Sequence, residues 1–150
     1  MLSRFFEQQD VNDDTKYLLD DQAMQRFIVE GYLTLHSELP RDYHARIYDE
    51  LEPLDETGPM GHNNLLPCVP DLRAMIEEPV VVGALTSLLG PDYYLHFHRH
   101  DHVNYPDGAQ PLHKDGDNHS HQAVDGWRRY HPTRYAMLFY YPQDTPGEAG

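Results

Sequence analysis

Apolar side chains in the first 90 residues recur at the spacing of amphipathic helices. A first helix can be capped by Asp20 or Asp21 and ended by Gly31, and its apolar face consists of Met24, Phe27 and Ile28. A second helix begins near Pro40 and carries an apolar residue at every fourth position until Pro53 stops the pattern. The N-terminal part of the chain is therefore predicted to be helical.

Two more helices are predicted before the spacing changes at Gly90. The first is short and lies at residues 72–76, and the second runs over residues 80–89 after Pro79. Beyond Gly90 the side chains alternate, which indicates strands. One strand rich in aromatic residues is predicted at 134–141, and a short one at 32–35. Helices followed by strands predict an α+β fold.

Histidine dominates one of the alternating stretches. Imidazoles occupy every second position there, at His96, His98, His100 and His102. Of the 11 histidines in the chain, seven lie between residues 96 and 121. Because neutral imidazole is the commonest protein ligand of metals, this density favours a metal site. For His96 and His102 a purely polar sheet face is the favoured interpretation.

Composition narrows the class of protein. The 150 residues fit one domain, in which residues 1–18 are predicted to form a polar, flexible arm. Lys and Arg number 11 against 25 Asp and Glu, and the net charge of −14 disfavours nucleic acid and anionic membranes as partners. No apolar run approaches the roughly 20 residues of a membrane helix, and the start of the chain does not resemble a leader. With Cys68 as the one cysteine, these features predict a cytoplasmic protein.

A short His-x-Asp sequence supplies candidate metal ligands. His113 and Asp115 lie two positions apart, so in an extended segment both side chains project from one face. Two histidines and one carboxylate on one face of an octahedron suit ferrous iron with open positions. The pair alone is weak support, because a chain with 11 His and 25 acidic residues contains such pairs by chance.

The surrounding sequence resembles the phytanoyl-CoA dioxygenase family in order and spacing over roughly residues 20 to 150. The segments that carry the resemblance are Leu89-Gly90-Pro91-Asp92-Tyr93, the histidine-rich stretch, Pro106-Asp107-Gly108, Gln110-Pro111-Leu112-His113-Lys114-Asp115 and Met137-Leu138-Phe139-Tyr140-Tyr141-Pro142-Gln143-Asp144. The resemblance implies N-terminal helices packed on a double-stranded β-helix, a jelly-roll barrel. It also implies an oxygenase that uses Fe(II), 2-oxoglutarate and dioxygen to hydroxylate a small organic molecule, with succinate and carbon dioxide as co-products.

Individual residues take roles from this resemblance. His113 and Asp115 become the first two iron ligands, and His100 and Phe139 are expected to face 2-oxoglutarate with Lys114 beside it. Phe139 as a core residue is an equal alternative. Since related halogenating enzymes replace the carboxylate ligand with a small residue, Asp115 favours hydroxylation.

The chain departs from the family at its C-terminal end. The family's third ligand, a histidine, and an arginine that pairs with 2-oxoglutarate lie beyond the segment that ends at Asp144. We therefore expect an incomplete barrel in an N-terminal portion of a longer protein. Within this chain, the third ligand could be replaced by His119, His121 or His131. The arginine that pairs with 2-oxoglutarate could be replaced by Arg128, Arg129 or Arg134.

Two other functions are open at this point. A cupin-like protein could hold zinc or another divalent ion on the histidine-rich face without 2-oxoglutarate. Alternatively, an inactive half-barrel could require a partner to complete its sheet. The sequence does not indicate the oligomeric state or the substrate.

Overall fold

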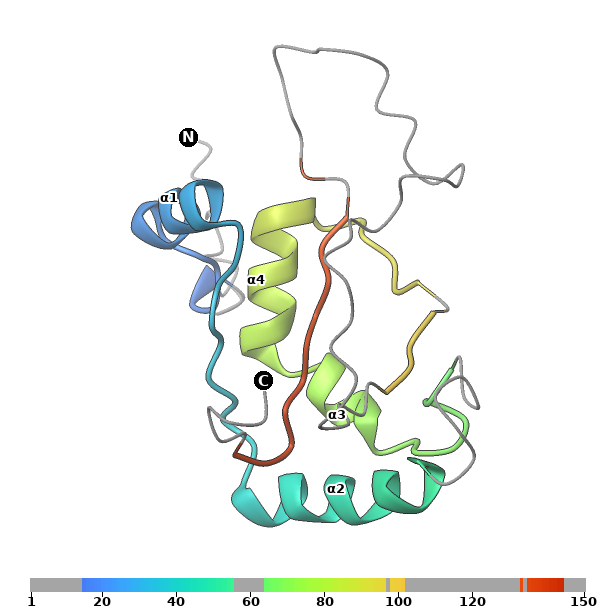
Figure 1. Cartoon of the computed structure of the whole chain (residues 1–150). Coiled ribbons are helices and arrows are strands. Elements are labelled where there is room, and N and C mark those ends of the chain that lie inside the picture. The colour runs from blue at the N-terminus through green and yellow to red at the C-terminus, as the bar shows by residue number, and fades with distance from the viewer. Residues whose placement is uncertain (1–14, 56–63, 97, 102–132, 134, 145–150) are drawn as a thin grey trace, which may run out of the picture.

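A computed structural model describes residues 15–55, 64–96, 98–101, 133 and 135–144 of the chain. These residues contain four helices: α1 (Asp21–Glu30), α2 (Arg41–Asp55), α3 (Leu72–Ile76) and α4 (Pro79–Leu89). In Figure 1, α2 lies across the bottom of the view, with α3 and α4 above it. Residues 135–144 run down toward the first half of α2.

The ends of α1 follow the expected capping chemistry. The Asp20 side chain accepts a hydrogen bond from the backbone N–H of Ala23 at 2.7 Å. Gly31 adopts φ 81°, a left-handed conformation that favours glycine, and its N–H donates to the Phe27 carbonyl at 2.9 Å. The prediction for this helix is confirmed. Its apolar face is only partly covered, since Ile28 remains 77% exposed.

The boundaries of the other helices agree closely with the sequence pattern. Pro79 occupies the first turn of α4, where its missing N–H breaks no helical hydrogen bond. Pro53, expected to stop α2, lies inside it, and the helix ends two residues later at Asp55. A proline so close to the end removes a hydrogen bond from the last turn only, so the helix tolerates it.

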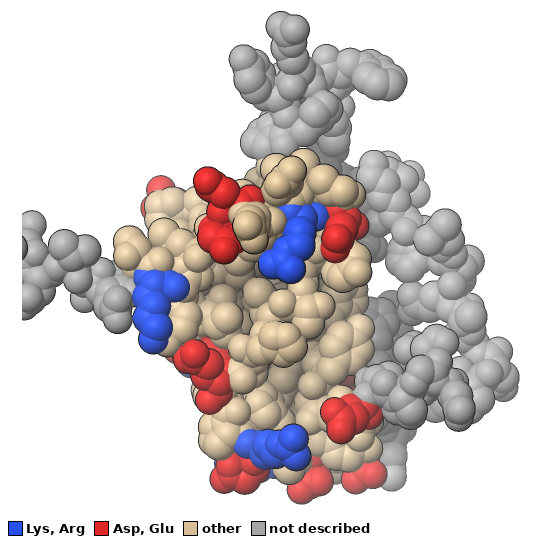
Figure 2. Space-filling model, turned by 90° about the vertical axis from the view of Figure 1, so that its left-hand side faces the viewer, with Lys and Arg blue, Asp and Glu red and all other residues tan. Residues whose placement is uncertain are grey.

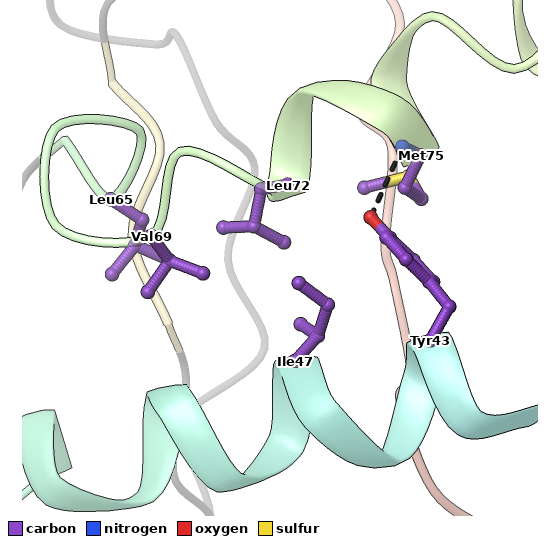
Figure 3. Packing of buried hydrophobic residues seen from close by; sticks show 6 residues of the cluster. All are labelled: Tyr43, Ile47, Leu65, Val69, Leu72 and Met75. Carbon is purple, nitrogen blue, oxygen red and sulfur yellow. Dashed lines mark hydrogen bonds between the residues drawn. The ribbon is translucent and has the colours of Figure 1, made fainter.

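The main core lies between α2 and the chain from residue 65 through α3. Its buried side chains are Tyr43, Ile47, Leu65, Val69, Leu72 and Met75, as Figure 3 shows. The Tyr43 hydroxyl donates to the Asp71 carbonyl at 2.8 Å and accepts from the Met75 N–H at 3.2 Å. Both hydrogen-bonding functions of this buried phenol are therefore satisfied.

A second area of packing places residues 15–19 against α4. Gly83 is buried, and a Cβ at this position would overlap the backbone carbonyl of Tyr17. One turn later the Ser87 hydroxyl donates to the Gly83 carbonyl at 2.8 Å and accepts from the Leu19 N–H at 2.9 Å. Glycine is thus required where the two backbones approach closely.

The expectation of an α+β jelly-roll barrel is wrong for the part of the chain that the structure describes. No strand, sheet or barrel occurs among these residues, and the predicted strand at 32–35 is irregular. The alternating stretches around Arg99 and Tyr140 form no ladder there; an isolated parallel bridge joins Asn64 to Arg99. Alternation specifies which side chains share a face, whereas a strand also requires a hydrogen-bonded neighbour.

Within the described ranges, no helix combines the length and apolarity needed to cross a bilayer. The most apolar helix, α4, has 11 residues.

Candidate functional site

The histidine-bearing segment holds its side chains on opposite sides. The rings of His98 and His100 lie with centroids 4.3 Å apart, and those of His96 and His98 lie 6.5 Å apart. Arg99, between the two closer histidines in sequence, instead donates from Nε and Nη2 to Asn64 Oδ1 at 3.0 and 2.8 Å. The Arg99 carbonyl accepts from the Leu65 N–H at 2.9 Å. The segment is therefore anchored through Arg99, and His98 and His100 meet as the alternation predicts.

The residues expected at the oxygenase site are only partly placed. His113, Lys114 and Asp115 lie outside the described residues. His100 is partly buried beside His98. Phe139 is 61% exposed, and its neighbour Tyr140 is the residue that contacts a histidine, His44. The structure therefore brings His100 together with His98, a pairing that the sequence assigned to the alternative metal-binding function.

A metal site requires several donor side chains close together. Among the described residues, no three His, Cys, Asp or Glu side chains gather closely enough to hold an ion. These residues alone therefore do not make a complete metal site. The imidazole of His113 and the carboxylate of Asp115 are nevertheless donor types that fit ferrous iron.

Sequence reasoning missed a hydrogen-bonded pair between α2 and residues 135–144. His44 Nδ1 and the Tyr140 hydroxyl are 2.7 Å apart. Burial, followed by the proximity of Tyr43 and Glu78, raises the pKa of Tyr140 to about 12. The phenol is neutral at physiological pH and donates to Nδ1 in the His44 tautomer that leaves this nitrogen unprotonated. His44 directly follows the apolar position Tyr43 on α2, which was the only sequence signal for its placement.

Glu78 is a second group that the sequence did not single out. It is 4% exposed and directly precedes α4. Its carboxylate accepts from the Ser37 hydroxyl at 2.8 Å and from the backbone N–H of Glu38. An anion beside a helix N-terminus is also stabilised by the helix dipole. Glu78 therefore connects the segment before α2 to the start of α4, which is a structural role.

One face of the molecule carries mixed rather than segregated charge. On the face drawn in Figure 2, acidic and basic side chains surround an area of uncharged residues. The basic side chains of this face stand apart from one another. This distribution provides no continuous basic track on the part of the face that is described.

Comparison with protein-family models, with curated proteins and with solved structures finds no match to this chain.

Proposed function

We propose that this chain belongs to a non-haem Fe(II)- and 2-oxoglutarate-dependent dioxygenase that hydroxylates a small organic molecule. The observation that carries the proposal is the sequence Leu112-His113-Lys114-Asp115, placed between a histidine-rich segment and Phe139-Tyr140-Tyr141-Pro142-Gln143-Asp144. This order is similar to that of the phytanoyl-CoA dioxygenase family.

Each residue in the proposed site has a chemical role. His113 and Asp115 would hold the iron through a nitrogen and an oxygen. The ammonium of Lys114 and the imidazole of His100 would attract and orient the dicarboxylate cosubstrate beside the ring of Phe139, which is 61% exposed among the described residues. Dioxygen activation, coupled to decarboxylation of 2-oxoglutarate, is the chemistry that the metal supplies when bound.

Fe(II) binding by the 150-residue protein tests this proposal. Under anaerobic conditions with 2-oxoglutarate, we expect measurable Fe(II) binding in equilibrium dialysis through the two ligands of this portion, and at least tenfold weaker binding for His113→Ala and for Asp115→Ala, as loss of one ligand requires. His36→Ala, an exposed histidine before α2, is the matched control and should bind normally. Absence of binding, or normal binding by both ligand variants, would overturn the proposal.

A divalent-metal-binding protein without 2-oxoglutarate is the second candidate function. The contact between the His98 and His100 rings favours it, since their centroids are 4.3 Å apart. Equilibrium dialysis with Zn²⁺ in place of Fe(II), and without 2-oxoglutarate, separates the two functions. For this second function, His98→Ala or His100→Ala abolishes Zn²⁺ binding, while Asp115→Ala leaves it unchanged.

A further inference from the structure

An open cleft of about 470 Å³ lies between α3 and the segment that contains Arg99. Apolar side chains form part of its lining: Leu66, Ile76 and Leu95. Two cations, Arg73 and Arg99, and one acid, Glu77, also line it. The volume falls within the range of sites for small molecules, and the open lining combines apolar side chains with polar and charged ones.

The two arginines differ in how their charge is balanced. Arg73 Nη1 lies 3.3 Å from Glu77 Oε1, in an ion pair whose side chains are 70% and 63% exposed. Arg99 is partly buried, and both of its described side-chain hydrogen bonds go to one neutral acceptor, Asn64 Oδ1. Within the described residues, no carboxylate forms an ion pair with Arg99. The cleft therefore contains a positioned guanidinium whose charge is not neutralised there.

We propose that this cleft binds a small organic carboxylate, with the carboxylate on the Arg99 guanidinium and the apolar body against Leu66, Ile76 and Leu95. Binding of both Nε and Nη2 to Asn64 fixes the guanidinium plane, so less side-chain entropy is lost when a ligand binds. Nη1 of Arg99 makes none of the described hydrogen bonds and can donate to the ligand. A planar guanidinium forms a stronger hydrogen bond with a carboxylate than with a neutral amide.

The negative charge of Glu77 should weaken the binding of an anion in this cleft. Its carboxylate lies in the same lining and competes for the positive charge of Arg73. Removing that negative charge should therefore strengthen binding of an anion. Because Glu77 is exposed and takes no part in the core, its substitution should leave the fold intact.

The site is independent of the proposed oxygenase function. Arg99 faces Asn64, whereas His98 and His100 contact each other. The experiment uses metal-free protein, so its failure would not bear on iron binding, and the reverse also holds.

Benzoate is the probe, with benzamide and benzylamine as neutral and cationic analogues of similar shape. Titrations of the metal-free 150-residue protein are followed by NMR chemical-shift changes. We expect benzoate to bind at least tenfold more tightly than benzamide, as a charge-assisted hydrogen bond predicts, and benzylamine not to bind. Equal affinity for benzoate and benzamide would overturn the proposal. Tighter binding of phenyl phosphate than of benzoate would overturn the assignment to a carboxylate.

Variants locate the binding in the cleft. Arg99→Met should weaken benzoate binding at least tenfold, and Glu77→Gln should strengthen it severalfold. The gain for Glu77→Gln cannot arise from unfolding. Arg46→Gln is the matched control, because Arg46 pairs with Asp71 outside this lining. Weakening by Arg46→Gln as large as that by Arg99→Met, or no gain for Glu77→Gln, would contradict the site.

Discussion

Substitution of Glu78 tests the polar connection between the segment before α2 and the start of α4. The Glu78 side chain is buried and accepts hydrogen bonds from Ser37 and from the backbone of Glu38. Glu78→Leu retains much of the volume but leaves both donors without this acceptor. Each hydrogen bond to a charged acceptor contributes about 1.5–3 kcal/mol net. Ser37 and Glu38 are exposed residues, so water offsets part of the loss, and we expect destabilisation of about 2–3 kcal/mol.

Glu78→Gln should be milder, at about 1 kcal/mol. The amide oxygen can still accept from the Glu38 N–H, and the amide nitrogen can donate to the Ser37 hydroxyl after that hydroxyl rotates. The remaining loss comes from replacing charge-assisted hydrogen bonds with neutral ones. Glu77→Gln, one residue earlier and 63% exposed at its side chain, is the matched control and should stay within about 0.5 kcal/mol of the original protein.

Urea unfolding followed by circular dichroism measures these free energies. Ser37→Ala, combined with Glu78→Leu, should show a coupling energy of about 1–2 kcal/mol, since both substitutions remove the same hydrogen bond. The reasoning is refuted if Glu78→Leu is as stable as Glu77→Gln. It is also refuted if the effects at positions 37 and 78 are additive.

Three further outcomes follow from the packing and from the raised pKa of Tyr140. Ile47→Ala should reduce the free energy of unfolding by about 2–5 kcal/mol in urea titrations, because Ile47 is 0% exposed; Ile28→Ala, at a 77% exposed position, should change it little. Gly83→Ala should lower the melting temperature, because its Cβ meets the Tyr17 carbonyl; a melting temperature at or above the original would contradict that close approach. Tyr140 has a pKa of about 12 in the folded protein, whereas an unfolded tyrosine ionises near pH 10. The contribution of the neutral phenol to stability is therefore complete below about pH 10 and is lost between about pH 10 and 12. Tyr140→Phe should therefore flatten the decline of unfolding free energy with pH in that window, and an unchanged slope would refute the assignment.

The helices were predictable because their signals are local. Asp20 and Gly31 mark the two ends of α1 through hydrogen bonds within one turn of it. Pro79 marks the start of α4, because its fixed φ angle and missing N–H suit the first turn of a helix. The predicted strands were wrong within the described residues, because alternation is a local signal whereas a ladder depends on residues far along the chain. The alternation around Tyr140 does distinguish inside from outside, since Tyr140 is partly buried while Phe139 and Tyr141 are 61% and 68% exposed.

The difference between local and long-range contacts also explains which site residues could be identified from the sequence. Spacing alone predicted that His98 and His100 share one side of a short segment, and in the structure their rings lie together there. Arg99 required knowledge of its partner Asn64, which lies 35 residues away and carries no sequence signal for that contact. The buried acid Glu78 was missed for a similar reason, since its donors at positions 37 and 38 belong to another segment. Chemistry confined to one segment can therefore be inferred from spacing, whereas a cleft between segments becomes visible only when the fold brings Arg73, Glu77 and Arg99 around it.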